Sequence, residues 1–300
     1  MKNIINNVAI VGGTHGNELA GVYLVNYWRD DEPQFIARSS FTTETLLANT
    51  KAIELNKRYF DSDLNRQFSA ESLADMSLSN YEQSRAKVIN QQLGPKGNPK
   101  SDLIIDLHNT TSNMGPSLLI PQQGEFYDLL AIYMHKVMPE AVVMLDEDHI
   151  ANDKHHLLST IAKRGVIVEV GPVPQGVLKH EVNEQMAKMT GIILDFVEMY
   201  NSDTLPQLPS STDAYRYLES LTLPVNDQGQ RMGMVHKNIE GNDFKAIKSG
   251  DPIFALFDGT EINYQGKDIV YPCFINEAAY YDSNLAMSLC EKVVIKHPQV

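Results

Sequence analysis

The turn after the first apolar segment combines two side chains of the kind that bind metal ions. Residues 12–18 read Gly-Gly-Thr-His-Gly-Asn-Glu and directly follow the apolar run at 8–11. His15 and Glu18 stand three positions apart, and imidazole and carboxylate groups are both ligands for Zn²⁺. Catalytic zinc sites usually hold the ion with three protein ligands and leave one position open to water. The pair alone is a weak signal, so a third ligand must come from elsewhere in the chain.

A second histidine stands at the end of another apolar segment. Residues 103–107 read Leu-Ile-Ile-Asp-Leu, and His108 follows, with Asp106 two positions before it on the same strand face. In an open α/β sheet, sites gather beyond the carboxyl ends of the strands. We therefore expect His15, Glu18 and His108 to meet there and to hold one Zn²⁺ per chain.

A carboxylate lies inside a third apolar segment. Residues 165–171 read Gly-Val-Ile-Val-Glu-Val-Gly, which places Glu169 in an otherwise apolar strand. Burying a carboxylate is costly unless it is paired or has a task. Burial raises its pKa, whereas a nearby Zn²⁺ favours the charged form. Such a glutamate can take a proton from water and pass it to a leaving amine. Pairing with a buried arginine is the structural alternative.

A charged segment supplies groups that suit an anionic substrate. Residues 57–66 read Lys-Arg-Tyr-Phe-Asp-Ser-Asp-Leu-Asn-Arg and include Arg58, Asn65 and Arg66. A guanidinium group can bind a carboxylate through two parallel hydrogen bonds. The segment therefore favours recognition of a carboxylate, although the same composition also fits a solvated loop.

These segments belong to a pattern in which strands alternate with helices. Short apolar runs predict strands at residues 8–11, 45–48, 103–107, 117–120, 141–145 and 166–170. Apolar side chains at helical spacing predict helices at residues 17–28, 81–93, 126–137, 157–163 and 181–200. The alternation indicates an α/β fold, with a mostly parallel mixed sheet flanked by helices.

The pattern changes after about residue 204. Pro206, Pro209 and neighbouring serines form a loop-like stretch, and short strand-like runs separated by turn signals follow. We therefore predict two domains. Residues 1–204 form the zinc-binding catalytic α/β domain, and residues 205–300 form a small β-rich domain that contributes to the entrance of the site.

Composition limits the class of partner. The 300 residues carry a formal net charge of −13, which argues against nucleic acid and anionic membranes as partners. No segment approaches the roughly 20 apolar residues of a membrane span, and the first residues do not read as a signal peptide. Two cysteines exclude a disulfide framework and are typical of a reducing compartment. We expect a cytoplasmic protein that acts on a small molecule.

Five segments together resemble the aspartoacylase family of zinc amidohydrolases. They are GGTHGNE at 12–18, RYFDSDLNR at 58–66, DLHNTTSNMG at 106–115, EVGPVPQGVL at 169–178 and YPCFINEAAYY at 271–281. The segments occur in the family's order and span almost the whole chain. The resemblance implies a fold similar to that of zinc carboxypeptidases, with an added C-terminal β domain.

The resemblance also implies the roles of the metal ligands and the catalytic residues. His15, Glu18 and His108 match the zinc ligands of the family. Glu169 matches its catalytic acid and base. Arg58 matches the arginine that polarises the scissile carbonyl and stabilises its oxyanion.

Substrate contacts are implied in the same way. The predicted contacts are Asn65, Arg66, Asn109, Thr110 and Tyr280. Asn65 and Arg66 match the pair that holds the substrate α-carboxylate. Tyr280 matches a tyrosine that reaches the site from the C-terminal domain. Asp63 and Glu277 lie within the same segments, where we expect them to support the residues around them.

The chain departs from the aspartate-specific members at one position. These members have an arginine ten residues before the catalytic glutamate, where it binds the substrate's side-chain carboxylate, and this chain has Ser159 there. A lysine after the tyrosine pair is also replaced, within residues 282–284. Burying an acidic side chain without a cationic partner costs on the order of several kcal/mol. The residues that could substitute are Arg164, Lys154 and His155.

The sequence thus predicts a zinc-dependent amidohydrolase that removes an acyl group, acetyl foremost, from N-acyl-L-amino acids. N-acetyl-L-aspartate is the leading substrate, and N-acetyl aromatic amino acids or S-conjugated N-acetylcysteines are the nearest alternative. A carboxypeptidase or a desuccinylase would share the metal signature. A non-catalytic metal-dependent binding protein is the alternative from another class. Members of the family are often dimers or tetramers, so the resemblance is compatible with a homo-oligomer, although the residues themselves do not indicate an oligomeric state.

Overall fold

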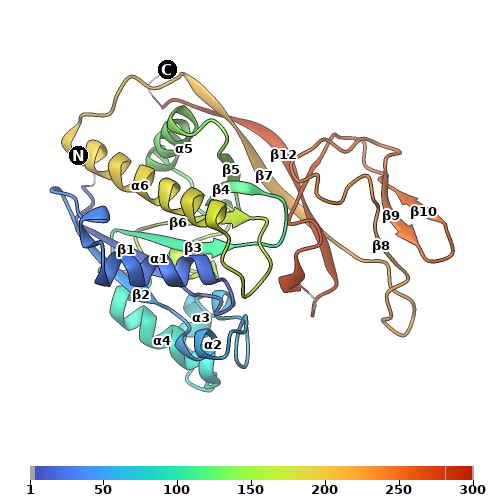
Figure 1. Ribbon diagram of the computed structural model, residues 1–300, viewed down its shortest axis with the longest axis horizontal. Helices are drawn as coiled ribbons and strands as arrows, with labels where there is room; N and C mark the ends of the chain where they lie inside the picture. The colour runs from blue at the N-terminus through green and yellow to red at the C-terminus, as the bar shows by residue number, and fades with distance from the viewer. Residues whose placement is uncertain (1–3, 281, 299–300) are drawn as a thin grey trace.

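One mixed β-sheet organises most of the chain. The structure is a computed structural model that describes residues 4–280 and 282–298. Within these residues, nine strands pair in the order β11-β12-β7-β5-β4-β6-β3-β1-β2, and three short strands form a second sheet, β10-β9-β8 (Figure 1). The larger sheet consists of β1 (Asn7–Gly12), β2 (Thr42–Leu47), β3 (Leu103–Asn109), β4 (Gly115–Ile120), β5 (Val142–Leu145), β6 (Arg164–Gly171), β7 (Ser211–Thr222), β11 (Tyr271–Cys273) and β12 (Leu285–Lys296). The smaller sheet consists of β8 (Gly233–Val235), β9 (Pro252–Leu256) and β10 (Glu261–Asn263).

Helices connect the strands of the first two thirds of the chain. The α-helices are α1 (Leu19–Asp30), α2 (Thr50–Glu54), α3 (Ala70–Ala74), α4 (Tyr81–Leu93), α5 (Glu125–Val137) and α6 (His180–Ser202). Short 3₁₀ turns are η1 (Pro33–Phe35), η2 (Leu64–Arg66), η3 (Leu158–Ile161) and η4 (Ala278–Tyr280). The helix predicted at 157–163 is only the turn η3, because β6 begins three residues after η3 ends and leaves no room for a longer helix.

Strand directions confirm the predicted fold class. β1 pairs in parallel with β2 and β3, β3 with β6, and β4 with β5, whereas β4 and β6 are antiparallel. The result is the predicted mostly parallel mixed sheet with flanking helices.

The two faces of the sheet have different coverings. Val8 and Ile10 of β1 pack into a core shared with α1, α5 and α6. Ala9 and Val11 point to the other face, where residues of α4 and η3 cover them. Strands buried on both faces read as continuous apolar runs, which is why the sequence revealed them so clearly.

The C-terminal strands differ from the short runs expected there. β7 and β12 have 12 residues each and pair antiparallel along nearly their whole length. β7 also pairs in parallel with β5, so it continues the sheet of the first 204 residues. Many side chains of β7 are exposed, and the strand therefore lacks the apolar run that marks a buried strand. The division at residues 204 and 205 remains a prediction.

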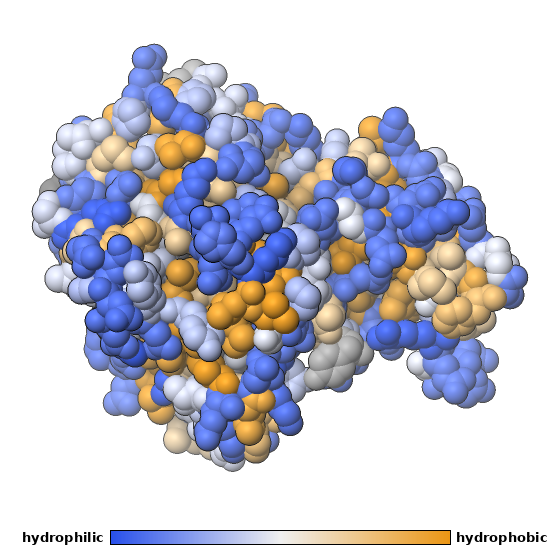
Figure 2. Space-filling model, in the orientation of Figure 1, coloured by the Kyte–Doolittle hydropathy of each residue, from blue (hydrophilic) through white to orange (hydrophobic). Residues whose placement is uncertain are grey.

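The surface is that of a largely hydrophilic molecule. The face shown in Figure 2 is mainly hydrophilic, with smaller apolar areas between the hydrophilic side chains. None of the helices within the described residues combines the length and the apolar character needed to cross a bilayer.

Candidate active site

A tight turn after β1 positions His15 and Glu18. Gly13 in this turn has a φ of +68°, a conformation that favours glycine. A Cβ on Gly16 would lie 2.1 Å from the backbone carbonyl carbon of Ala52, so the turn packs directly against α2. The backbone N–H of Glu18 donates to the carbonyl of His15 at 3.2 Å, and α1 begins at the next residue. The sequence thus fixes both side chains at the carboxyl end of β1.

The neighbouring strands β3 and β6 place the other two predicted groups, His108 and Glu169, side by side. His108 and Glu169 occupy the same register position on these neighbouring parallel strands. Side chains at one register position point to the same face, here the face opposite α1, α5 and α6. Both side chains are buried. The strand order therefore explains how residues far apart in the chain meet.

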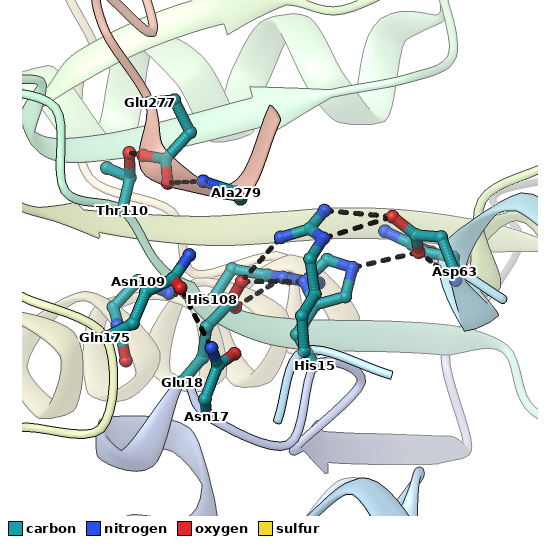
Figure 3. A network of polar contacts seen from close by, with 12 residues as sticks. His15, Asn17, Glu18, Asp63, His108, Asn109, Thr110, Gln175, Glu277 and Ala279 are labelled. Carbon is teal, nitrogen blue, oxygen red and sulfur yellow. Dashed lines mark hydrogen bonds and ion pairs between the residues drawn. The ribbon is translucent and has the colours of Figure 1, made fainter. Parts of the chain in front are cut away.

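The three predicted metal ligands converge on one point. The Nδ1 atom of His15 lies 2.7 Å from Oε1 of Glu18, and the Nδ1 atom of His108 lies 2.9 Å from Oε2 (Figure 3). The two imidazole rings meet edge to face, with centroids 4.9 Å apart. Ligand atoms from all three residues lie within 4.8 Å of one another.

Carboxylates orient the two histidines from behind. The Nε2 atom of His15 lies 3.0 Å from Oδ1 of Asp63, and that of His108 lies 2.9 Å from Oδ2 of Asp106. Thr14 donates its hydroxyl to Asp106 at 2.7 Å. Metal-binding histidines typically give their second ring N–H to a carboxylate. His15 matches this pattern through its hydrogen bond to Asp63, whereas His108 and Asp106 lie at ion-pair distance without hydrogen-bond geometry. Thr14 was not predicted from the sequence. Its position directly before His15 is the one feature of the sequence that could have indicated this supporting role.

The electrostatic environment shifts the pKa values of two buried carboxylates, Glu18 and Glu169, in opposite directions. Burial opposes ionisation of Glu18, but the two histidines outweigh it and hold its pKa below the ordinary value. For Glu169, burial raises the pKa well above the ordinary value, and the carboxylates of Glu18 and Glu277 add to the rise. Paired carboxyl groups with diverging pKa values are typical of acid–base sites.

Arg58 lies between the metal ligands and the charged loop. Its Nη1 atom donates to Oε1 of Glu18 at 3.3 Å, and its Nη2 atom donates to Oδ2 of Asp63 at 2.9 Å. The guanidinium carbon lies 5.9 Å from the centre of the Tyr280 ring. Asp63 also accepts a hydrogen bond from the backbone N–H of Asn65 at 2.8 Å. Asp63 thus connects a histidine, Arg58 and the start of η2.

The predicted residues line one cavity of about 190 Å³. All ten are on its wall: His15, Glu18, Arg58, Asn65, Arg66, His108, Asn109, Thr110, Glu169 and Tyr280. Within η2, Asn65 accepts a hydrogen bond from the backbone N–H of Leu158 at 2.8 Å, which fixes the amide next to η3. Arg66 donates to the carbonyl of Asn65 at 3.1 Å. The last residue of the fifth segment, Tyr281, lies outside the described residues.

Asn109 and Thr110 are engaged within the protein. The backbone N–H of Asn109 donates to Glu18 at 3.3 Å, and its side-chain oxygen accepts from Ala20 at 3.3 Å. The hydroxyl of Thr110 donates to Glu277 (Figure 3). Glu277 also accepts from the backbone N–H of Thr111 at 2.8 Å. Glu277 therefore ties the C-terminal part of the chain to the loop after β3.

The candidate replacements for the missing arginine lie elsewhere. Ser159 is fully buried. Arg164 is the first residue of β6, and its guanidinium carbon lies 5.0 Å from the centre of the Phe126 ring in α5. Lys154 is exposed. Neither they nor His155 belong to the described residues that line the cavity. The suggestion that one of these side chains points into the cavity is therefore wrong.

The remaining cavity wall is apolar and acidic. Its apolar side chains include Leu119, Leu157, Ile167, Phe274 and Leu285. Asp146, Glu147 and His156 also line it, and none of them was predicted. Among the described lining residues, the permanent cations are Arg58 and Arg66.

Comparison with known proteins assigns the family. Residues 4–197 match the succinylglutamate desuccinylase/aspartoacylase catalytic domain, and residues 210–292 match the AstE/AspA barrel-sandwich hybrid domain. The chain belongs to the succinylglutamate desuccinylase/aspartoacylase family. This confirms the resemblance inferred from the five segments.

Individual members of the family are similar over almost their full length. A probable aspartoacylase of Trichodesmium erythraeum is 42% identical, over 97% of this chain and 99% of the relative. The N-acyl-aromatic-L-amino acid amidohydrolase of Rattus norvegicus is 39% identical, over 97% of this chain and 92% of the relative. The crystal structure of murine aminoacylase 3 superimposes with a TM-score of 0.92 at 37% identity, and the match covers 99% of each chain.

Proposed function

We propose that this protein is a zinc-dependent amidohydrolase that removes the acyl group, acetyl foremost, from N-acyl-L-amino acids. His15, Glu18 and His108 would hold one zinc ion. The observation that carries the proposal is the pair of buried histidines that direct Nδ1 toward Glu18, each with a carboxylate oxygen within 3.0 Å of its Nε2 atom. Membership of a family of aspartoacylases and aminoacylases supports it.

Glu169 would move the protons of the reaction. When bound, zinc acts as a Lewis acid that polarises the amide carbonyl and makes water acidic enough to attack at neutral pH. Glu169 accepts the proton of the attacking water and then delivers it to the leaving amine. Its position beside His108 on the neighbouring strand supports this role. A binding protein without catalysis has no need of such a group, so an intact Glu169 favours an enzyme.

The two arginines would bind different parts of the substrate, Arg58 the scissile carbonyl and Arg66 the α-carboxylate. The guanidinium of Arg58 stabilises the negative charge that develops on the carbonyl oxygen, and Asp63 and Glu18 fix its orientation. Asn65 and Arg66 bind the substrate α-carboxylate, which positions the amide for attack. Tyr280 closes this side of the cavity from η4.

N-acetyl-L-aspartate is the first candidate substrate. The cyanobacterial relative carries the name probable aspartoacylase, and two arginines line the cavity of this chain. Because Arg58 lies beside the carbonyl and Arg66 binds the α-carboxylate, the side-chain carboxylate of the aspartate would have to share Arg66.

An N-acyl amino acid with an uncharged, apolar side chain is the second candidate. The wall beyond the arginines carries Leu119, Phe274 and Leu285 together with two acidic side chains, Asp146 and Glu147. Such a wall favours an apolar group over a carboxylate. The rat relative is named for N-acyl aromatic amino acids.

A side-by-side assay separates the two candidates and tests the proposal. We would measure kcat/KM of the zinc-loaded protein on N-acetyl-L-aspartate and on N-acetyl-L-tyrosine. The protein should release acetate from at least one of these substrates. A chelator should abolish this activity, and added zinc should restore it. A preference for the aspartate would mean that Arg66 and its surroundings accept a second carboxylate. Hydrolysis of neither would contradict the proposed substrate class. A cytoplasmic location and a homo-oligomeric state remain predictions.

A further inference from the structure

A second group of metal-binding side chains lies in the segment between β5 and η3. Residues 146–156 read Asp-Glu-Asp-His-Ile-Ala-Asn-Asp-Lys-His-His. Ligand atoms of Glu147, His155 and His156 lie within 4.8 Å of one another. Oε2 of Glu147 and Nε2 of His156 lie 4.0 Å apart. These atoms are too far apart to hydrogen-bond directly, so there is space between them for a shared partner.

His155 is a buried imidazole that lacks the partners it needs. The residue has no exposed surface, and neither of its ring nitrogens makes a hydrogen bond of normal geometry with the described residues. Burial, together with the nearby positive charges, lowers the pKa of His155 to about 4, and the backbone of Asp146 opposes this shift only in part. A buried polar atom left without a partner costs about 1–3 kcal/mol. The burial of His155 next to two other ligand side chains is therefore an independent indication that something binds there.

The charges around this group do not exclude a cation. The ammonium of Lys96 donates to the carbonyl of His155 and to the hydroxyl of Thr160, each at 2.8 Å, which directs it to the backbone side. Asp146 and Glu147 supply negative charge on the cavity side. Arg66 also lies near His156 and adds positive charge there.

We propose that Glu147, His155 and His156 form a second site for a divalent transition-metal ion, separate from His15, Glu18 and His108. Two imidazoles and one carboxylate are donors that suit Zn²⁺, Co²⁺ or Ni²⁺, whereas Ca²⁺ and Mg²⁺ require mainly oxygen ligands. Glu147 and His156 also line the substrate cavity. An ion at this site adds positive charge to a wall whose permanent cations are Arg58 and Arg66.

Metal stoichiometry tests the second site. The full-length protein is stripped with a chelator and dialysed against buffered Zn²⁺, and zinc per chain is measured by mass spectrometry. We expect two ions in the wild type and one in both Glu147→Gln and His156→Ala. His149→Ala is the matched control, because His149 lies in the same segment and is exposed, and this variant should keep two ions. His108→Ala should lose one ion and retain the second site.

A spectroscopic measurement tests the count independently of the zinc analysis. A Co²⁺ titration should produce a second absorption change at the second equivalent, and His156→Ala should lack it. A single equivalent in the wild type would overturn the proposal. A second equivalent that survives in Glu147→Gln and His156→Ala, or that disappears only in His149→Ala, would also overturn it, because the ion would then be bound elsewhere.

Discussion

At the scale of single residues, Asp63 connects the predicted metal site to the predicted substrate site. Its carboxylate contacts His15, Arg58 and the backbone of Asn65, and all three lie on the cavity wall. The sequence segment that contains Asp63 suggested only that it supports its neighbours. The structure shows which neighbours these are, because η2 folds the loop back toward the turn after β1.

Replacing Asp63 by asparagine should reduce activity more than stability. The amide keeps the size of the side chain but removes the charge that holds Arg58 and orients His15, so kcat/KM should fall about 10- to 100-fold. Steady-state kinetics and the zinc content of Asp63→Asn measure this. Asp61→Asn, in the exposed part of the same loop, is the control. Wild-type activity in Asp63→Asn would contradict the orienting role.

Asp146 should make the stability of the metal-free protein depend on pH. Burial raises its pKa to about 7, and Glu147 adds to the rise. The folded protein therefore binds a proton more tightly at this site than the unfolded chain does, and stability falls as pH rises from about 4 to about 7. Urea unfolding at pH 5 and pH 8, with chelator present, should show this loss. The loss should be smaller by roughly 1 kcal/mol in Asp146→Asn, and an equal loss in both proteins would contradict the assignment.

At the scale of secondary structure, the sequence predicted strands that are buried on both faces and missed those that are not. β1, β3 and β6 appear as apolar runs because helices or loops cover each face. β7 is half exposed and follows a proline-rich stretch, so no local pattern shows that it extends the main sheet. Pairing between β5 and β7 is set by long-range geometry. A sequence read window by window does not contain that information.

The contact between the turn after β1 and α2 should be necessary for the site. A Cβ at position 16 would collide with the backbone of Ala52, so Gly16→Ala must displace the turn that carries His15. We expect a loss of about 1–3 kcal/mol in the free energy of unfolding and weaker zinc binding. Chemical denaturation and a zinc titration measure the two effects. Gly191→Ala in α6, where the nearest atom is 3.4 Å away, should leave zinc affinity unchanged. Normal zinc affinity in Gly16→Ala would contradict this account.

At the scale of the whole molecule, the C-terminal part completes the cavity. Glu277 reaches from this part to Thr110 and Thr111, and Tyr280 forms the adjoining wall. The ten residues predicted for the site could be named from the sequence because each lies in a distinctive local segment, and all ten line the cavity. Asp146, Glu147 and His156 were not assigned to the cavity, because only the packing of distant segments brings their loop to its wall.

Removing the charge of Glu277 should loosen this connection. Its carboxylate accepts from the Thr110 hydroxyl and from the backbone N–H of Thr111 and Ala279, and an amide accepts through one oxygen only. Glu277→Gln should therefore lower kcat/KM about 10-fold. It should also lower the free energy of unfolding by about 1–2 kcal/mol. Kinetics and thermal unfolding measure this, with the exposed Glu219→Gln as control. Unchanged kinetics would show that the contact does not shape the cavity.

The central claim is that His15, Glu18 and His108 hold zinc while Glu169 transfers the protons. The most direct test is to measure zinc content and kcat/KM in Glu169→Gln beside the wild type, on whichever N-acetyl amino acid the wild type hydrolyses. We predict unchanged zinc content and a loss of at least about 100-fold in kcat/KM, because the amide cannot accept the proton of the attacking water. Full zinc occupancy with activity near that of the wild type would contradict the account.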